Sequence, residues 1–188
     1  GRNLLDRNPR LTSIAALFFN KTIGNSRIKT KGKNNILNYS RSFLKKTKIE
    51  VVGDRNSIEF GEKCYLEDCK ISILGNNNRI YLGNRVYLKD ADLYIEDSGN
   101  EIIINNRTAI CGTTHLACTE GKKIVIGEHC LFSSDVVFRT GDSHSIIDLN
   151  GNRINHANDI IVGNHVWIGN KTILTKGSKV SDNSIVAT

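Results

Sequence analysis

One histidine in this sequence stands in a setting that could support proton transfer. His144 lies in the polar segment RTGDSHSIIDLNGNRIN, and Asp142 precedes it by two residues. Imidazole is the side chain whose pKa lies nearest neutral pH, so a histidine can accept and release a proton there. A carboxylate can orient such a ring, and residues two apart share one face of an extended strand. Asp142 is therefore a candidate to orient His144, although a turn residue beside a surface histidine would look the same.

The other reactive side chains give weaker signals. The cysteines contain no C-x-x-C pair and the histidines contain no H-x-x-x-x-H pair, so we expect no metal site. No G-x-S-x-G elbow or paired Cys-His motif is present, so no nucleophile that forms a covalent intermediate is expected. The cysteines are Cys64, Cys69, Cys111, Cys118 and Cys130, and the other histidines are His115, His129, His156 and His165.

The amino-acid composition says more about the binding partner of the protein than about its fold. The 188 residues carry a net charge of +7, which favours an anionic partner such as a phosphate-rich cofactor or an acidic sugar polymer. Aromatic residues make up only 6% and no basic-aromatic motif occurs, which argues against nucleic acid. Because no run of 18 apolar residues is present, we expect no transmembrane segment and a cytoplasmic protein.

The elements that must position His144 are predicted by an internal repeat with a period of 22 residues. Four segments that begin at Asn56, Asn78, Asn100 and Lys122 can be stacked so that the same columns recur, and a weaker copy begins at Asn34. The apolar columns are Ile58, Ile80, Ile102 and Ile124, then Phe60, Leu82, Ile104 and Ile126, then Leu66, Leu88, Ile110 and Phe132. Within each copy the pattern repeats every six residues, with glycine or asparagine after the second column.

Six-residue steps of this kind are hexapeptide repeats, and three steps close one triangular coil whose aliphatic residues stack on the coils above and below. The sequence therefore predicts an all-β fold, a left-handed parallel β-helix, with a β-sandwich or another solenoid as the alternatives. One irregularity is visible, because the third apolar pair sits at Ile71/Ile73 and Leu93/Ile95 but, further along the chain, at Val136/Phe138, a slip of roughly one residue from the period.

Two segments do not follow the repeat. Residues 1–33 precede it, and their apolar residues are spaced roughly as in an amphipathic helix, so we expect an N-terminal cap that covers the open strand edge. The period is interrupted after Phe138 and resumes at Val162, which predicts that residues 144–161 protrude as a loop from a β-helix domain spanning 34–188. Loops that project from a rigid solenoid commonly carry the functional site.

The residues around this break resemble a known family. SSDVVFRTGDSHSI, NGNRIN and IIVGNHVWIGN are similar to the hexapeptide-repeat O-acetyltransferases, a group that includes the galactoside and maltose acetyltransferases. RTGDSHSI and GNRIN are closer to the O-acetyltransferases of capsule, O-antigen and sialic acid clusters. The resemblance is strong over about 100–188, extends as a pattern to about residue 34, and is absent before that.

The resemblance implies roles for residues near the break. It makes His144 the general base for an acceptor hydroxyl and places Trp167 beside the pantetheine arm of coenzyme A. Gly169 and Asn170 match the turn whose backbone N–H stabilises the oxyanion, an effect worth ~3 kcal/mol. The phosphate end of the cofactor is expected at Thr175, Lys176, Gly177 and Thr188. The predicted catalytic residues are thus His144, Asp142 and Asn170.

Polar residues of the loop and one histidine of the coils are candidates for the acceptor side. Arginine pairs well with the carboxylate of an acidic sugar. The candidate acceptor-binding residues are His115, Arg139, Ser143, Asn152, Arg153 and Asn155. Asn150-Gly151-Asn152 is equally typical of a plain turn.

Together these features predict direct transfer of an acetyl group from acetyl-coenzyme A to a sugar hydroxyl of a bacterial surface polysaccharide or its precursor. The resemblance implies a homotrimer with its sites between subunits and no required metal. Alternatively, an enzyme with the same fold could acetylate an antibiotic, serine or an amino sugar. A zinc hydratase of this fold is disfavoured because no H-x-x-x-x-H pair occurs, and an inactive scaffold because His144 and Trp167 are both present.

Overall fold

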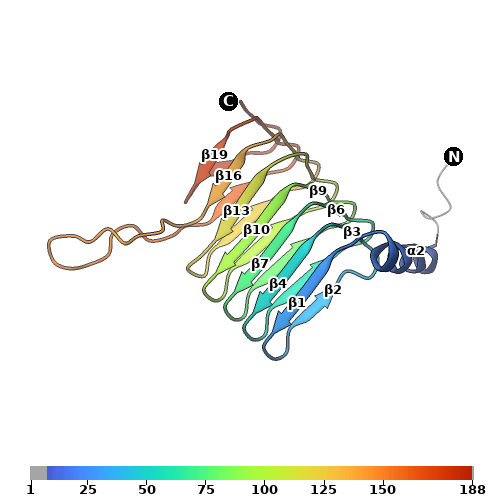
Figure 1. Cartoon of the computed structure of the whole chain (residues 1–188). Helices are drawn as coiled ribbons and strands as arrows, with labels where there is room; N and C mark the ends of the chain where they lie inside the picture. Colours follow the sequence, from blue (N-terminus) through green and yellow to red (C-terminus); the bar gives the residue numbers. More distant parts are fainter. Residues whose placement is uncertain (1–7, 188) are drawn as a thin grey trace.

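The apolar columns spaced 22 residues apart form the inner side of three parallel sheets that wind around one core (Figure 1). A computed structural model describes residues 8–187 of the chain. Each sheet has seven strands, and every coil contributes one strand to each sheet, as a left-handed parallel β-helix requires. This confirms the predicted fold.

The strands of sheet 1 are β1 (Arg27–Lys31), β4 (Lys48–Val52), β7 (Lys70–Leu74), β10 (Ala91–Glu96), β13 (Thr114–Cys118), β16 (Val136–Arg139) and β19 (Ile173–Thr175). Those of sheet 2 are β2 (Ile36–Asn38), β5 (Ser57–Phe60), β8 (Arg79–Leu82), β11 (Glu101–Ile104), β14 (Lys123–Ile126), β17 (Ile160–Val162) and β20 (Lys179–Val180). Those of sheet 3 are β3 (Phe43–Lys45), β6 (Tyr65–Glu67), β9 (Tyr87–Lys89), β12 (Ala109–Ile110), β15 (Leu131–Phe132), β18 (Trp167–Ile168) and β21 (Ile185–Val186).

Stacking of identical inward positions buries the core. Ile80 pairs with Ile58 below and Ile102 above, and all three side chains are fully buried. At the corner that follows β7, Gly75 has a φ of +145°, and a Cβ there would lie 1.8 Å from the Asp97 carbonyl oxygen. Only glycine fits such an approach of one coil to the next.

A small change in the core should be measurable. Ile102→Val removes one methylene from a fully buried stack and should lower the free energy of unfolding by about 1 kcal/mol. Ile103→Val on the same strand is the matched control, because Ile103 faces outward and is half-buried. Denaturant unfolding of the two variants compares them, and equal losses would contradict the inward and outward assignment.

The irregularity seen in the sequence is one extra residue at a corner. Ile71 pairs with Leu93, 22 positions later, whereas Leu93 pairs with Leu116, 23 positions later. The neighbouring strand pair keeps the offset of 22, since Tyr87 pairs with Ala109. The additional residue therefore lies between β12 and β13, and it shifts which side chains of sheet 1 face each other.

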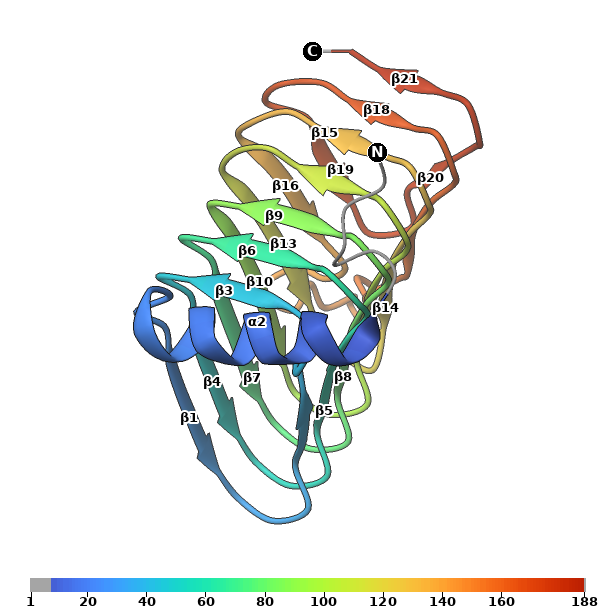
Figure 2. The ribbon, with the colours of Figure 1, turned by 90° about the vertical axis from the view of Figure 1, so that its right-hand side faces the viewer.

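The N-terminal helix α2 (Pro9–Thr22) packs against the first strand of sheet 3 (Figure 2). Asn20 accepts a hydrogen bond from the Leu44 backbone N–H at 2.8 Å and donates to the Ser42 carbonyl at 2.9 Å, so it satisfies the edge of β3. The predicted boundary at residue 34 falls between β1 and β2, because β1 already pairs with β4. Residues 1–7 of the expected N-terminal cap lie outside the described residues.

Candidate active site

The break in the repeat is a long protrusion between β16 and β17 (Figure 1). It leaves sheet 1 after Arg139 and returns to sheet 2 at Ile160. Its two limbs run antiparallel and meet at an isolated bridge between Ile147 and Arg153. The limbs are therefore held to each other next to the turn of residues 148–152, and the Ile154 N–H also donates to the Ile146 carbonyl oxygen at 2.9 Å.

Asn155 holds the base of the protrusion together. This residue is buried, and its Oδ1 accepts hydrogen bonds from the Ile146 N–H at 2.7 Å and the Arg153 Nε at 3.2 Å. Its Nδ2 donates to the Asp142 Oδ2 and to the His144 carbonyl oxygen, both at 2.8 Å. The backbone that carries His144 is thus fixed by a buried amide. Asn155, predicted to bind the acceptor, uses its polar atoms inside the loop.

Two ion pairs tie the protrusion to the coils. The Lys176 Nζ lies 2.6 Å from the Asp142 Oδ2, and the Arg153 guanidinium lies 2.5 Å from the Glu120 Oε1. The hydrogen bond from Lys176, followed by that from Asn155, lowers the pKa of Asp142. The hydrogen bond from Arg153 is the main cause that lowers the pKa of Glu120. Both carboxylates therefore stay charged at neutral pH and keep the loop attached.

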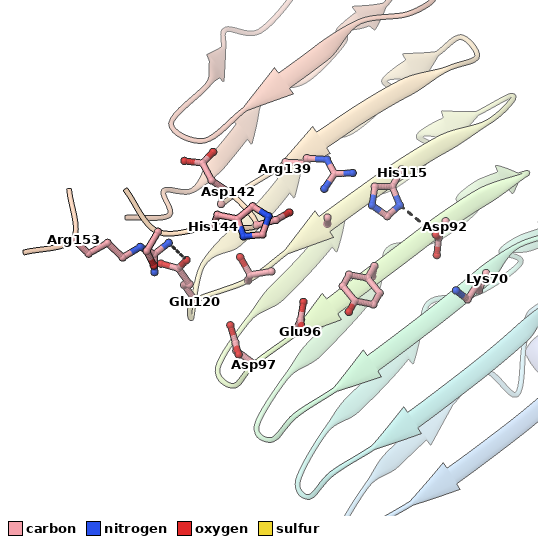
Figure 3. Close-up of a pocket in the computed structure, with 16 residues that line it drawn as sticks. Lys70, Asp92, Glu96, Asp97, His115, Glu120, Arg139, Asp142, His144 and Arg153 are labelled. Carbon is pink, nitrogen blue, oxygen red and sulfur yellow. Dashed lines mark hydrogen bonds and ion pairs between the residues drawn. The ribbon is translucent and has the colours of Figure 1, made fainter. Parts of the chain in front are cut away.

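The loop and the outer face of sheet 1 enclose a cleft of about 550 Å³ (Figure 3). Its walls carry side chains of both charges. It is lined by Lys70, Asp92, Tyr94, Glu96, Asp97, His115, Ala117, Thr119, Glu120, Arg139, Gly141, Asp142, Ser143, His144, Ser145 and Arg153. It unites four of the predicted acceptor-binding residues, namely His115, Arg139, Ser143 and Arg153, with His144.

His144 is exposed in this cleft, and no hydrogen bond to its ring is present among residues 8–187. Asp142 does not make the predicted contact with this imidazole, because its carboxylate is engaged by Lys176 and Asn155. The imidazole is thus free to approach a ligand in the cleft. Its orientation is set by the backbone, which Asn155 holds, rather than by a carboxylate.

The histidine that does have a carboxylate partner is His115 on β13. Its Nδ1 lies 3.2 Å from the Oδ2 of Asp92 on β10, and the two side chains are 30% and 35% exposed. This hydrogen bond is the main cause that lowers the pKa of Asp92. The other oxygen of Asp92, Oδ1, is buried and has no hydrogen-bond partner within the described part of the chain. Figure 3 shows the two side chains facing each other, and Tyr94 lines the same cleft.

Asp92 is the main residue of the cleft that the sequence did not suggest. At a strict offset of 22, His115 would stand above Leu93, an inward position, and only the extra residue between β12 and β13 places it above Asp92. The irregular spacing of the apolar pairs was the available signal. Lys70, Tyr94, Glu96, Asp97 and Glu120 were also not anticipated.

The residues expected near the thioester lie elsewhere on the chain. Trp167 is on β18 of sheet 3, 50% exposed, and is not among the residues that line the cleft on sheet 1. The Gly169 N–H donates to the Val186 carbonyl at 2.7 Å, whereas no hydrogen bond from the Asn170 N–H occurs within the described range. The Asn170 side chain donates to the Ser134 Oγ at 2.7 Å. One chain therefore does not bring His144 and Trp167 together.

The remaining predicted site residues lie on the surface of the coils or in the protruding loop. Thr175 is exposed on β19 beside Arg139, and Gly177 has a φ of +81° in the turn that follows. Lys176 is held by Asp142 and by the Asn155 carbonyl. Asn152 is in a turn at the tip, where its backbone N–H donates to Asp148 at 2.8 Å. Thr188 lies outside the described residues.

Comparison with characterised proteins identifies the family. The chain is 31% identical over 148 residues to a polysialic acid O-acetyltransferase of Neisseria meningitidis, covering 78% of this chain and 68% of that protein. The chain belongs to the polysialic acid O-acetyltransferase family. A second member, from Escherichia coli O1:K1 / APEC, is 38% identical over 60 residues, which are 31% of this chain and 20% of that protein. No family model matches the chain.

Solved structures of this family share the fold. The polySia-specific acetyltransferase NeuO superposes with a TM-score of 0.76 at 23% identity, covering 87% of this chain and 82% of that chain. The polysialic acid O-acetyltransferase OatWY gives a TM-score of 0.64 at 30% identity, covering 85% and 75%. The predicted relationship to hexapeptide-repeat sugar O-acetyltransferases is thereby confirmed. No helix in the described part of the chain is long and apolar enough to cross a membrane.

Proposed function

We propose that this chain transfers an acetyl group from acetyl-coenzyme A to a hydroxyl of a sialic acid residue, in polysialic acid or in a related bacterial surface polysaccharide or precursor. Its 31% identity to the N. meningitidis polysialic acid O-acetyltransferase carries the proposal. The cleft supports it, since the exposed imidazole of His144 shares it with Lys70, Arg139 and Arg153. We place the reaction in the cytoplasm and expect it to need no metal.

In the proposed reaction His144 is the general base. Its imidazole takes the proton of the acceptor hydroxyl while the hydroxyl oxygen attacks the thioester carbonyl carbon, which makes the attack feasible at neutral pH. The carbon–sulfur bond then breaks, and the imidazolium returns the proton to the departing thiolate. The products are one acetyl ester and one molecule of coenzyme A. The Asn170 N–H is our candidate donor to the tetrahedral oxyanion, because the N–H of Gly169 is already bonded.

The acceptor side is assigned to the basic residues of the cleft, which is also lined by Asp92, Glu96, Asp97, Glu120 and Asp142. Arg139 and Arg153 line it together with His115 and Lys70, and a sialic acid residue carries one carboxylate. A guanidinium can bind a carboxylate through two parallel hydrogen bonds. We infer that Arg139 binds the carboxylate, because Arg153 is engaged by Glu120. His115, held by Asp92, presents its Nε2 to a sugar hydroxyl.

The donor side requires a second copy of the chain. Trp167 and Asn170 belong to sheet 3 and the corner after it, whereas His144 belongs to the loop beyond sheet 1. A homotrimer with grooves between subunits would place the tryptophan of one copy near the histidine of the next. The outward apolar column of Tyr65, Tyr87, Leu131 and Trp167 on sheet 3 supports such packing, since these residues share one face.

The proposal is tested by incubating the purified chain with acetyl-coenzyme A and polysialic acid and measuring thiol release and ester formation together. We expect thiol release that depends on the acceptor, with one ester formed per thiol. Acceptor-independent release, or acetylation of an antibiotic, serine or an amino sugar alone, would overturn the assignment to polysialic acid.

The pair of Asp92 and His115 gives a second test of the acceptor side. Asp92→Asn keeps the shape but removes the charge that holds the imidazole, and a charge-assisted hydrogen bond is about twice as strong as a neutral one. We expect the KM for the acceptor to rise about fivefold, with the KM for acetyl-coenzyme A unchanged.

Asp97→Asn is the matched control for this variant. Asp97 lines the same cleft, but among the described residues its side chain makes no hydrogen bond to a histidine. An equal rise in KM for both variants would mean that the overall charge of the cleft acts, and would remove Asp92 and His115 from acceptor binding. Steady-state kinetics with each substrate varied in turn measures both constants.

A further inference from the structure

The N-terminal helix α2 presents large apolar side chains to solvent. On the side that packs against the first coil, Thr12 and Ala16 are buried and the Phe19 ring lies against Phe43. The side that faces away carries what we call the exposed stripe, namely Leu11, Ile14, Leu17 and Phe18, and the last three are 65%, 69% and 65% exposed. A helix that only covered a strand edge would turn such side chains toward the core.

Cations stand at both ends of the exposed stripe. Arg10 and Lys21 are exposed and share the face of Ile14 and Leu17, because positions three and four apart are neighbours on a helix. No acidic residue occurs between positions 8 and 49 of the sequence. The helix therefore combines an apolar surface with positive charge alone.

The open end of the core lies beside the stripe. A hollow of about 510 Å³ is bounded there by Leu17 of the helix and by Ile28, Tyr39 and Leu44 of the first coil. Ile28 and Tyr39 are only partly buried, although they pack against the core. The apolar surface of this end thus extends from the helix onto the coil.

Nearly all of the positive charge of the chain lies at the same end. Residues 8–69, which form α2 and the first two coils, contain 12 basic and six acidic residues, whereas residues 70–187 contain 12 basic and 12 acidic ones. All six acids belong to the second coil, where Glu62 pairs with Arg41 and Glu67 pairs with Lys45 of the first coil. Helix α2 and the first coil, residues 8–47, carry nine basic residues and no acid. The outermost layer of this end is therefore cationic.

Three cations of this end lie together without a carboxylate partner. Arg27, Lys46 and Lys48 line a hollow of about 210 Å³ with Asn25, and no acidic residue is among its walls. None of the three has an ion pair within residues 8–187. Arg27 stands directly opposite Lys48, which stands opposite Lys70 on the next strand. Like charges directly opposite in a sheet are destabilising, so an anion bound here would relieve the repulsion.

An anionic membrane surface fits this end better than a second copy of the chain or a soluble polyanion. Helices that lie in a membrane interface combine an apolar stripe with basic residues, and anionic headgroups attract the cations beside them. A second copy would bring two cationic ends together, and Lys29 and Lys31 on β1 hinder pairing of this edge strand with another strand. A soluble polyanion would satisfy the cations but leave the stripe in water.

We propose that α2 and the first coil form a surface that docks the protein on an anionic lipid bilayer. The exposed stripe enters the boundary between headgroups and acyl chains, and Arg10 and Lys21 reach the headgroups from its two ends. Arg27 and Lys48 bind lipid phosphates. The cleft stays open in the docked molecule, because no residue before Lys70 lines it and the loop and α2 lie on opposite sides of the solenoid (Figure 1).

The test measures sedimentation of the purified chain with vesicles of phosphatidylcholine that contain about 30% phosphatidylglycerol, and with vesicles of phosphatidylcholine alone. We expect binding to the anionic vesicles that salt weakens, and little binding to the neutral ones. Leu17→Ser/Phe18→Ser removes the apolar contact and should weaken binding about tenfold or more. Arg27→Gln/Lys48→Gln should weaken binding about tenfold at low salt.

Two double variants elsewhere on the chain are the matched controls. Ile147→Ser/Leu149→Ser removes two exposed aliphatic side chains from the loop, on either side of Asp148. Lys171→Gln/Lys179→Gln removes two exposed cations from the opposite end of the solenoid. Both controls should bind anionic vesicles as the wild type does. The thermal midpoint of each variant shows that its coils remain folded.

Four outcomes would overturn the proposal. They are failure of the wild type to sediment with anionic vesicles, and an equal loss of binding in a control variant. The third is a changed oligomeric state of Leu17→Ser/Phe18→Ser with unchanged vesicle binding, which would mean that a second copy covers the stripe. The fourth is binding of soluble polysialic acid that competes with the vesicles and is lost only in Arg27→Gln/Lys48→Gln. Sedimentation requires no turnover, so a failure of the proposed acetyl transfer would be seen separately.

Discussion

Replacing His144 with alanine is expected to lower kcat about 100-fold or more, while the KM for acetyl-coenzyme A remains nearly unchanged. A positioned general base contributes about 10²- to 10⁴-fold to such reactions, because the acceptor hydroxyl is otherwise a poor nucleophile at neutral pH. The ring of His144 is exposed in the cleft and makes no hydrogen bond within the described residues, so its removal disturbs no other contact. Thiol release under saturating substrates measures the effect.

His156→Ala is the control for this variant. His156 is an exposed histidine of the same loop and is not among the residues that line the cleft. We expect its kcat to be unchanged. Near-normal turnover of His144→Ala would exclude His144 as the base, and His115 would then be the next candidate, because it is the histidine with a carboxylate partner.

Asn155→Asp is expected to lower kcat about 10- to 100-fold without changing the unfolding of the solenoid. The variant keeps the size of the side chain and the oxygen that accepts from Ile146. It replaces the Nδ2 donor, which binds Asp142 and the His144 carbonyl, by a negative oxygen that repels both. A buried polar group left without its partner costs about 1–3 kcal/mol, and two contacts are lost here. The loop should therefore leave the position in which it presents His144.

Two measurements separate loss of loop order from loss of fold. Limited proteolysis between residues 140 and 159 should be faster in Asn155→Asp, and the thermal midpoint of the coils should stay the same. Asn158→Asp is the matched control, because Asn158 is exposed and its side chain makes no hydrogen bond among the described residues. If Asn155→Asp had wild-type kcat and wild-type proteolysis, the buried amide would not be what positions His144.

Much of the architecture could be predicted because every coil of a stacked solenoid needs the same types of residue at the same positions. Each inward residue must be apolar and must lie over its counterpart, so the spacing of Ile58, Ile80 and Ile102 determines both the strand and its register. The interruption after Phe138 was visible for the same reason, since a loop that leaves the core no longer needs the period. The resemblance of the residues on either side of the break then indicated an O-acetyltransferase.

The cleft was predicted less completely, because its contacts depend on small shifts and on long-range folding. Asp142 is near His144 in sequence, yet its carboxylate binds Lys176, which is 34 residues away. Asn152 and Asn155 were both expected to bind the acceptor, but one stabilises a turn at the tip and the other is buried at the base of the loop. Local spacing could not distinguish these roles, since they follow from how the loop folds back on the coils.

The surroundings of His144 illustrate which features could be read from the sequence and which needed the folded structure. The β-helix, the position of the break and the histidine in it could all be inferred from the order of the residues, because stacking forces a regular period that any insertion interrupts. The folded chain was needed to show that the His144 backbone is held by the buried amide of Asn155 and not by a carboxylate, and that Asp92 pairs with His115. These contacts escape prediction because one extra residue at a corner shifts the register of outward side chains while the apolar core beneath them continues to stack.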